Sequence, residues 1–196
     1  MKKFAFAVAA LALVSLSAQA QTYTPVQAKN HRFIAGMGFT SGGDTLATAS
    51  YTDGASQNIK TGGMLAFYGG VEYDVAQDLA IQATIGYHVD QAHADNGEIR
   101  FGRYPLEVLA AYKLSPQWRF GGGVRFVNSP RLSSSGAGDI GDFNFKNTVG
   151  AVLEGEYLFS PAFGVKLRYV SEKYEPKNGA GKLDANHVGI MGNFYF

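Results

Sequence analysis

Apolar and polar residues alternate with a period of two along most of this chain. In FGVKLRYVSE, which begins at Phe163, the two classes separate onto opposite faces: Phe163, Val165, Leu167 and Tyr169 on one, and Lys166, Arg168 and Glu172 on the other. Such alternation is typical of a β-strand whose two faces meet different surroundings. Similar segments recur, and we predict eight strands at about residues 32–41, 62–75, 79–90, 101–114, 118–128, 145–159, 163–175 and 184–196.

The connections between these strands alternate in length. Three are short, namely VAQDL (75–79), LSPQW (114–118) and FSPAF (159–163), and a prolyl residue in two of them suits the second position of a tight turn. The other four are longer and polar, at about 42–61, 91–100, 129–144 and 176–183. Short turns at one end and long loops at the other, with an even number of strands, are typical of an up-and-down transmembrane β-barrel.

A soluble β-sandwich or lipocalin-like barrel would show the same alternation, with its apolar face turned inward. Aromatic residues near both ends of the apolar faces favour the membrane barrel, because such girdles form at the two bilayer interfaces. The girdle residues are Tyr73, Tyr112, Trp118, Tyr157, Phe159, Phe163 and Phe196 on the turn side, and Tyr87, Tyr104, Phe126 and Tyr169 on the loop side. The opposite faces carry charges in mid-strand, which also favours the membrane barrel. In the first long loop, TLATASYT still alternates, and this alternation predicts a hairpin that projects beyond the membrane.

The first residues have the three parts of a secretory signal. MKK is basic, FAFAVAALALVSL is apolar, and AQA at residues 18–20 is a cleavage site between small residues. The alternative, a membrane anchor, is disfavoured because a spanning helix needs about 20 apolar residues. We therefore predict a signal peptide at 1–20, a short periplasmic segment at 21–31 and an outer-membrane barrel at 32–196.

Charge and cysteine content exclude several functional classes. Without Lys2 and Lys3 the 17 basic residues fall to 15, against 16 acidic residues, so we expect no nucleic-acid partner. The sequence contains no cysteine, which excludes a disulfide scaffold and a thiolate metal site.

From about residue 30 to 196 the chain resembles the small eight-stranded outer-membrane barrels of the OmpA-like and OmpX-like group, the outer membrane protein β-barrel domain family. The resemblance rests on the strand rhythm, the Ser-Pro turns and the terminal FYF. It implies an integral protein of the Gram-negative outer membrane, monomeric, in contact with membrane lipid and lipopolysaccharide. It also implies recognition by the barrel-assembly machinery through the alternating residues of the last strand: Val188, Ile190, Phe194 and Phe196. The peptidoglycan-binding domain of full-length OmpA-like proteins is expected to be absent.

Alternation also assigns a set of charged residues to the barrel interior. The predicted lumen charge network consists of Glu72, Arg103, Glu107, Lys113, Arg119, Arg125, Glu154, Glu156, Lys166 and Arg168, with Gln82 and His88 on the same inner face. A barrel of about eight strands has an interior just wide enough for side chains to fill. Charges confined there must pair, so we predict a plugged lumen; the alternative is a charge-lined conduction path.

The favoured function is a structural or surface-interaction role in the cell envelope, with an extracellular ligand met by the four long loops. The alternative is a small-solute or hydrophobic-compound pore of the OmpW-like kind, and a lipid A-modifying barrel enzyme is less favoured. The segment HVDQAHAD (88–95) could hold a metal, but it lacks a serine at nucleophile spacing, and Ser129 and Ser171 are remote. We therefore predict no catalytic residue, no cofactor and no metal.

Overall fold

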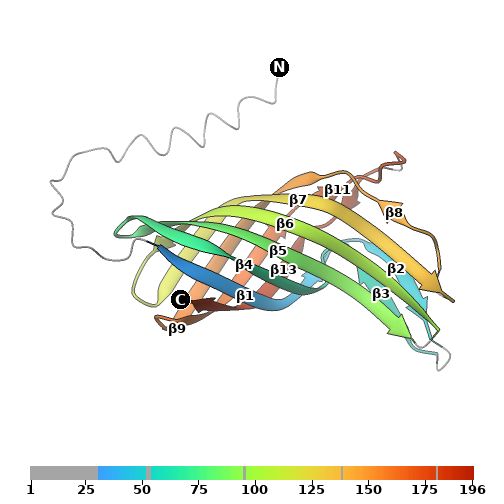
Figure 1. Ribbon diagram of the computed structural model, residues 1–196, viewed down its shortest axis with the longest axis horizontal. Coiled ribbons are helices and arrows are strands. Elements are labelled where there is room, and N and C mark those ends of the chain that lie inside the picture. The colour runs from blue at the N-terminus through green and yellow to red at the C-terminus, as the bar shows by residue number, and fades with distance from the viewer. Residues whose placement is uncertain (1–30, 52–53, 95, 138, 180) are drawn as a thin grey trace, which may run out of the picture.

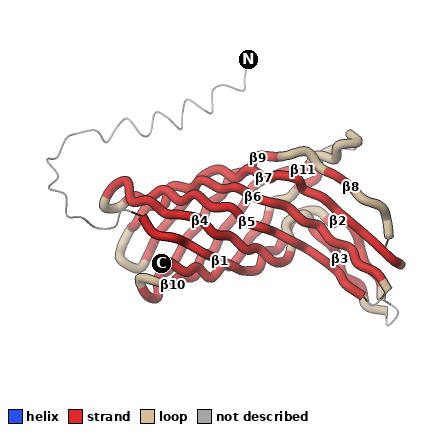
Figure 2. The backbone as a smooth tube through the Cα atoms, viewed as in Figure 1, coloured by secondary structure: helices blue, strands red, loops and turns tan. Residues whose placement is uncertain are grey.

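The computed structural model describes residues 31–51, 54–94, 96–137, 139–179 and 181–196. The predicted signal peptide and nearly all of the 21–31 segment lie outside these residues. In the described part of the chain, eight long antiparallel strands close into a barrel (Figures 1 and 2). They are β1 (His31–Gly42), β4 (Met64–Ala76), β5 (Leu79–Ala94), β6 (Gly97–Lys113), β7 (Trp118–Gly136), β9 (Thr148–Ser160), β10 (Phe163–Ser171) and β13 (His187–Tyr195).

Each long strand pairs with its neighbours in sequence, and the barrel closes where the first strand meets the last. β1 pairs with both β4 and β13, and backbone hydrogen bonds between Phe33 and Phe196, of 3.2 and 3.0 Å, lie at this seam. Five short strands lie at the outer end: β2 (Thr45–Ser50), β3 (Ser56–Lys60), β8 (Phe143–Asn144), β11 (Lys173–Tyr174) and β12 (Leu183–Asp184). No helix among the described residues is long and apolar enough to cross a bilayer.

The three short turns lie at the positions predicted from the sequence. In the β6–β7 turn, Ser115 Oγ accepts hydrogen bonds from the backbone N–H groups of Gln117 (3.3 Å) and Trp118 (3.0 Å). In the β9–β10 turn, Ser160 Oγ accepts one from Ala162 N–H at 3.3 Å. Serine therefore satisfies backbone donors in these turns, as short hydroxyl side chains commonly do.

The predicted assignment of faces is confirmed by side-chain exposure. Outward-facing apolar residues are exposed, for example Phe33 at 62%, while the charged residues of the opposite face are buried. Aromatic rings form a nearly continuous chain on the turn side, running from Phe120 through Trp118, Tyr157, Phe159 and Phe163 to Phe194 with centroid separations of 4.9–6.4 Å. On the loop side the rings of Tyr87 and Tyr104 are 5.1 Å apart.

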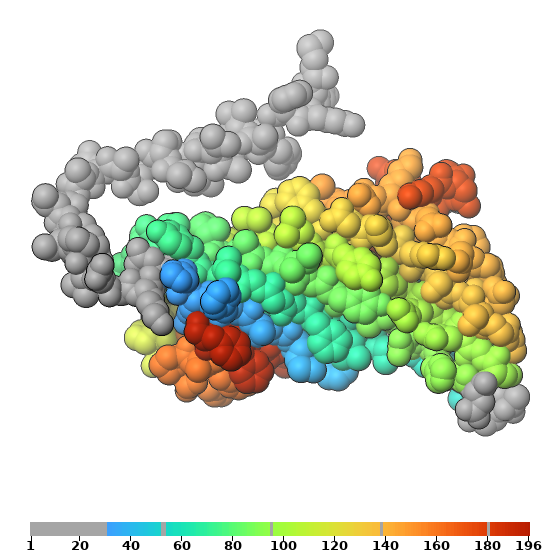
Figure 3. All heavy atoms as spheres, viewed as in Figure 1, coloured from blue at the N-terminus to red at the C-terminus, as the bar shows by residue number. Residues whose placement is uncertain are grey.

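The predicted loops at 91–100 and 129–144 are wrong in extent. β5 and β6 continue to Ala94 and from Gly97, and β7 continues to Gly136, so these strands extend the barrel at its outer end (Figures 1 and 3). The polar residues that suggested loops, such as Gln91 and Arg100, are exposed on one face, while Ala92 and Phe101 are buried on the other. The first long loop contains the predicted hairpin, formed by β2 and β3.

Candidate functional site

The barrel interior holds the largest concentration of buried charge among the described residues. Each strand alternates between a lipid-facing and an inward residue, so the eight strands direct polar and charged side chains into one narrow space. The structure places nine of the ten predicted network residues in this buried interior. Lys113 instead lies at the turn-side rim, where it is partly exposed and pairs with Asp74 at 2.6 Å.

The layer nearest the turns is centred on Glu72. This carboxylate accepts hydrogen bonds from Arg119, from Arg32 Nε at 2.8 Å and from Gln82 Nε2 at 2.6 Å. All of these residues except the partly exposed Arg32 are buried. Three donors for one carboxylate replace the water that burial removes.

A second carboxylate, Glu156, occupies the same end of the lumen. Tyr195 Oη donates to it at 2.6 Å and Asn193 Nδ2 at 2.8 Å, while Arg119 Nη1 lies 3.4 Å from its other oxygen. Arg119 thus bridges Glu72 and Glu156 and joins strands β4, β7 and β9 across the interior.

In the middle of the lumen, Lys166 and Glu154 form a buried ion pair of 2.5 Å. Tyr68 completes this layer, with its ring 5.8 Å from Lys166 Nζ and its hydroxyl donating to Asn193. Lys166 and Glu154 come from the paired strands β10 and β9, but they are not directly opposite residues, because Lys166 faces Glu156 in the register.

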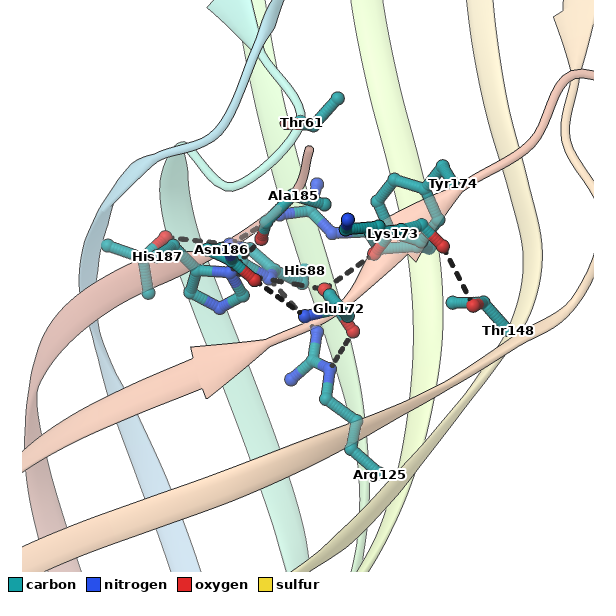
Figure 4. Close-up of polar contacts among 12 residues, drawn as sticks. Thr61, His88, Arg125, Thr148, Glu172, Lys173, Tyr174, Ala185, Asn186 and His187 are labelled. Atoms are coloured by element: carbon teal, nitrogen blue, oxygen red, sulfur yellow. Dashed lines mark hydrogen bonds and ion pairs between the residues drawn. The ribbon is translucent and has the colours of Figure 1, made fainter. Parts of the chain in front are cut away.

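The next layer toward the outside is built on Glu107. Its two oxygens accept from Arg125 Nη1 and Arg168 Nη2, each at 2.7 Å, so one carboxylate neutralises part of two buried cations. Arg125 also donates from Nε to Glu172 at 3.1 Å (Figure 4). The alternating cations and carboxylates form a connected network, which is the arrangement that makes buried charge tolerable.

Arg103 and His88 lie at the outer side of this layer. His88 contacts Arg103 Nη2 at 2.9 Å, Arg125 Nη2 at 3.2 Å and Thr40 Oγ1 at 2.7 Å. Among the described residues no carboxylate forms an ion pair with Arg103, whose guanidinium stacks 4.9 Å from the Phe101 ring centroid. Arg103 therefore marks the boundary between the charged network and an apolar region.

That apolar region closes the outer end of the lumen. We call it the outer cap, a cluster of buried apolar residues: Ile59, Ala92, Ile99, Phe101, Val127, Leu132, Phe145, Tyr174 and Ala185. Three of its rings, Phe101, Phe145 and Tyr174, lie 5.5–6.2 Å apart. Tyr174 also donates its hydroxyl to Glu172 at 2.7 Å, so it connects the cap to the charged network (Figure 4).

Hydrogen bonds between backbone and side-chain groups of the outer loops hold the cap in place. Asp44 and Asp184 exchange hydrogen bonds of 2.8 and 2.7 Å, and Thr61 Oγ1 donates to the carbonyl of Asp184 at 2.7 Å. Asn186 Oδ1 accepts from the backbone N–H of Glu172 at 3.0 Å (Figure 4). Gly43 has φ of +75°, and a side chain there would collide with Thr61, which explains the glycine at this crossing.

Sequence reasoning missed several residues of the lumen. Alternation places Glu172 on the same face as Lys166 and Arg168, yet the predicted network does not include it; in the structure it is buried in the lumen. Tyr68 and Tyr195 also lie on inward positions. The predicted network omits them because the tyrosines of this sequence are typical of the aromatic girdles at the bilayer interfaces. The outer cap could not have been found by parity, because it requires the fold of the long loops.

The segment HVDQAHAD does not gather into one site. His88 is buried in the lumen, while His93 is exposed on the opposite face of β5, and Asp95 lies outside the described residues. Ser129 and Ser171 are exposed. No group of three or more His, Asp or Glu residues in the described ranges is arranged to hold a metal ion.

At the outer tip, an open groove of about 780 Å³ lies between the β2–β3 and β5–β6 hairpins. Tyr51, His93, Glu98 and Ile140 are among its lining residues, so it presents polar and apolar groups together. It is the larger of two described surface hollows at this end.

Among the described residues, the outer end also carries three exposed ion pairs: Arg131–Asp142 at 2.5 Å, Lys146–Glu175 at 2.6 Å and the longer Arg100–Glu98 at 3.9 Å. The hydrogen bond from Arg131 lowers the pKa of Asp142, and the hydrogen bond from Lys146 lowers the pKa of Glu175. Neither lowering is accompanied by burial, so solvent screens both pairs.

The predicted assembly residues form one outward row on β13. Val188, Ile190 and Phe194 are exposed, and Phe196, immediately after the strand, is 75% exposed. Their neighbours His187, Met191, Asn193 and Tyr195 are buried on the inner face.

Solved structures of similar fold are small outer-membrane barrels. Ail, the attachment invasion locus protein of Yersinia pestis, solved with the heparin analogue sucrose octasulfate, has a TM-score of 0.55 at 10% identity, covering 85% of this chain and 97% of Ail. Neisserial surface protein A has a TM-score of 0.52 at 12% identity, with coverage of 85% and 97%. No curated protein sequence matches the chain.

A family model described as the outer membrane protein beta-barrel domain matches residues 6–196, nearly the whole sequence. The match agrees with the closed eight-stranded barrel, its lipid-facing apolar rows and its two girdles. This chain belongs to the outer membrane protein β-barrel domain family and is an integral protein of the outer membrane.

Proposed function

We propose that this protein is a closed barrel with a structural and surface-interaction role in the cell envelope, and that its lumen does not conduct. The observation that carries the proposal is the continuous filling of the interior. Buried, paired charges occupy it from Glu72 near the turns to Glu172, and the apolar outer cap lies above them. A conduction path would require several of these pairs and the cap to separate together.

The outer end supplies the surface for interaction. The 780 Å³ groove combines aromatic, carboxylate and imidazole groups at the tips of two hairpins that the barrel holds in position. Rigid scaffolds commonly present binding residues in this way. The ligand is sought among molecules outside the cell, because the groove lies at the outer tips of these hairpins.

Planar-bilayer recording tests the closed lumen. The wild type is expected to show no steady conductance. The double variant Glu107→Ala/Arg125→Ala, which removes one ion pair and leaves Arg168 and Glu172 in the layer, is expected to show at most brief openings while the cap remains. Leu106→Ala, on the lipid-facing side, is the control. Steady conductance by the wild type would contradict the proposal and favour the small-solute or hydrophobic-compound pore.

A lipid A-modifying activity is tested separately. Mass spectra of lipid A from cells with and without the protein are expected to be the same, and a modified species would instead support an enzyme.

We also propose that the outward row of β13 is recognised during assembly. Phe196→Ala keeps the backbone hydrogen bonds to Phe33, so the barrel seam is retained. The folded, heat-modifiable gel band from cells is expected to fall several-fold, while the protein refolded in detergent keeps nearly normal stability. Phe33→Ala, an exposed aromatic on the neighbouring strand, is the control. Equal yields of the two variants would reject recognition of Phe196.

A further inference from the structure

A second hollow at the outer end lies on the side of the barrel, next to the lipid-facing surface. It has a volume of about 420 Å³ and is formed where the segment entering β9 runs beside the end of β10 and β11. Three lysines line it, namely Lys146, Lys173 and Lys182. Val149 and Ser171, which also line it, continue the outward rows of β9 and β10. We call this hollow the lysine cleft.

The walls of the lysine cleft are held by hydrogen bonds between the two segments. Lys146 N–H donates to the carbonyl of Glu175 at 2.8 Å. Thr148 Oγ1 donates to the carbonyl of Lys173 at 2.8 Å, as Figure 4 shows. Behind them, Phe145 and Tyr174 are buried in the outer cap. The lysines therefore stand on a fixed backbone.

The charge of the lysine cleft is not balanced by its own carboxylates. Glu175 pairs with Lys146, and the other carboxylate of the lining, Glu172, is buried and directed to Arg125 and Tyr174 in the lumen. Among the described residues, no carboxylate forms an ion pair with Lys173 or Lys182, and both are exposed. Two ammonium groups beside the exposed Ser171 hydroxyl match a phosphate group, which binds lysine as a concentrated negative charge.

The position of the lysine cleft selects the source of that phosphate. Val149 and Tyr169 are exposed on the lipid-facing surface, one on each of the two strands that lead into the cleft. Ser171 follows Tyr169 by two residues on the same face of β10, and the exposed Lys173 begins β11, so the cleft lies directly beyond these lipid-facing residues. Juxtamembrane lysines attract anionic lipid headgroups.

We propose that the lysine cleft binds the phosphate of a phosphorylated lipid in the outer leaflet of the outer membrane. The inference depends on the membrane location and not on whether the lumen conducts, so a failed lipid test and a failed conductance test are separable. It assigns Lys173 and Lys182 as the principal contacts, because Lys146 is already paired with Glu175.

Native mass spectrometry of the full chain in detergent tests the proposal, with bisphosphorylated lipid A as the probe. The wild type is expected to retain this lipid, and Lys173→Gln/Lys182→Gln is expected to lower its affinity by about tenfold or more, as loss of charge-assisted hydrogen bonds does. The control is Lys177→Gln/Arg100→Gln, which removes the same charge from exposed residues outside the cleft. It is expected to bind within about twofold of the wild type.

Three outcomes would overturn the proposal. Equal loss in both double variants would indicate attraction by net charge alone. Equal retention of chemically dephosphorylated lipid A would show that acyl contacts, and not phosphate, are recognised. Full displacement of lipid A by inorganic phosphate at a concentration near that of the lipid would indicate a site for a free anion. Both double variants must give the wild-type unfolding profile, which neutral substitution at exposed positions is expected to preserve.

Discussion

Ion pairs of nearly the same length occur in two regions of this barrel. Arg125 and Glu107 lie 2.7 Å apart in the lumen, with side chains 3% and 6% exposed. Lys146 and Glu175 lie 2.6 Å apart at the outer end, with side chains 53% and 37% exposed. The distances alone would assign the two pairs equal importance, but their surroundings do not.

The difference lies in what replaces each partner when it is removed. At the outer end, water solvates the remaining charge, and exposed pairs add little to stability. In the lumen the remaining charge stays buried, and loss of one partner costs far more than the intact pair contributes. The lumen pairs therefore specify which closed arrangement is stable, whereas the outer pairs mainly shape the surface charge.

The largest effect is expected for Glu107→Ala, because this substitution leaves both Arg125 and Arg168 without their shared carboxylate. The free energy of unfolding should fall by about 3–5 kcal/mol. Urea unfolding of the protein refolded in lipid vesicles measures it. Glu107→Gln, which keeps the shape and one acceptor, should fall between the wild type and Glu107→Ala. An unchanged midpoint for Glu107→Ala would remove the distinction between the two regions.

The next test removes one partner and then both from the simplest lumen pair. Lys166→Met leaves Glu154 buried without a cation and should destabilise the barrel by about 3 kcal/mol. Lys166→Met/Glu154→Gln should recover most of this loss, to within about 1 kcal/mol of the wild type. If the double variant is as unstable as the single one, then packing and not charge imbalance is the cause.

A cation on the lipid-facing side provides a third comparison. Leu167→Arg places a charge against lipid between the two girdles, which should cost about 2–4 kcal/mol. Ser171→Arg lies on the same face but beyond Tyr169, where the cost should be about 0–1 kcal/mol. The same urea assay measures both. Equal costs would mean that Leu167 is not in the hydrocarbon region.

The smallest effect is expected for Glu175→Gln. Because the hydrogen bond from Lys146 lowers the pKa of Glu175, any stabilisation by the pair is present at neutral pH and is lost as the pH falls through the lowered pKa. Exposure should nevertheless make the change in unfolding midpoint undetectable at neutral pH, in low or high salt. A shift comparable to that of Lys166→Met would show that exposure does not govern the strength of these pairs.

The alternation of residues was enough to predict the barrel, its turns and its faces. Parity is a local property, so Phe33 and Glu107 could be assigned to opposite surfaces from their neighbours alone. The same pattern did not predict where β5 and β6 end. Gln91 and Arg100 resemble loop residues because the outer parts of these strands are exposed to solvent on one face and pack against the outer cap on the other.

Only some partners inside the lumen follow from strand pairing, as Glu107 and Arg125 do, which are directly opposite each other on β6 and β7. Lys166 pairs with Glu154 and not with the directly opposite Glu156, which is occupied by Tyr195 and Asn193 from another strand. Such choices depend on which side chains from other strands reach the same carboxylate, and parity does not contain that information. Tyr174 shows the same limit, since its place in the cap follows from the fold of β11 and β12 over the lumen.

The seam between β1 and β13 has a consequence for how the protein folds. Phe33 and Phe196 form backbone hydrogen bonds with each other although almost the entire barrel separates them in sequence. Bringing such distant segments together carries a loop-closure entropy, and folds dominated by long-range pairings fold slowly. The edges of β1 and β13 stay unpaired until that step, and an open edge is a site of aggregation. The chain must therefore be protected from self-association until the seam closes.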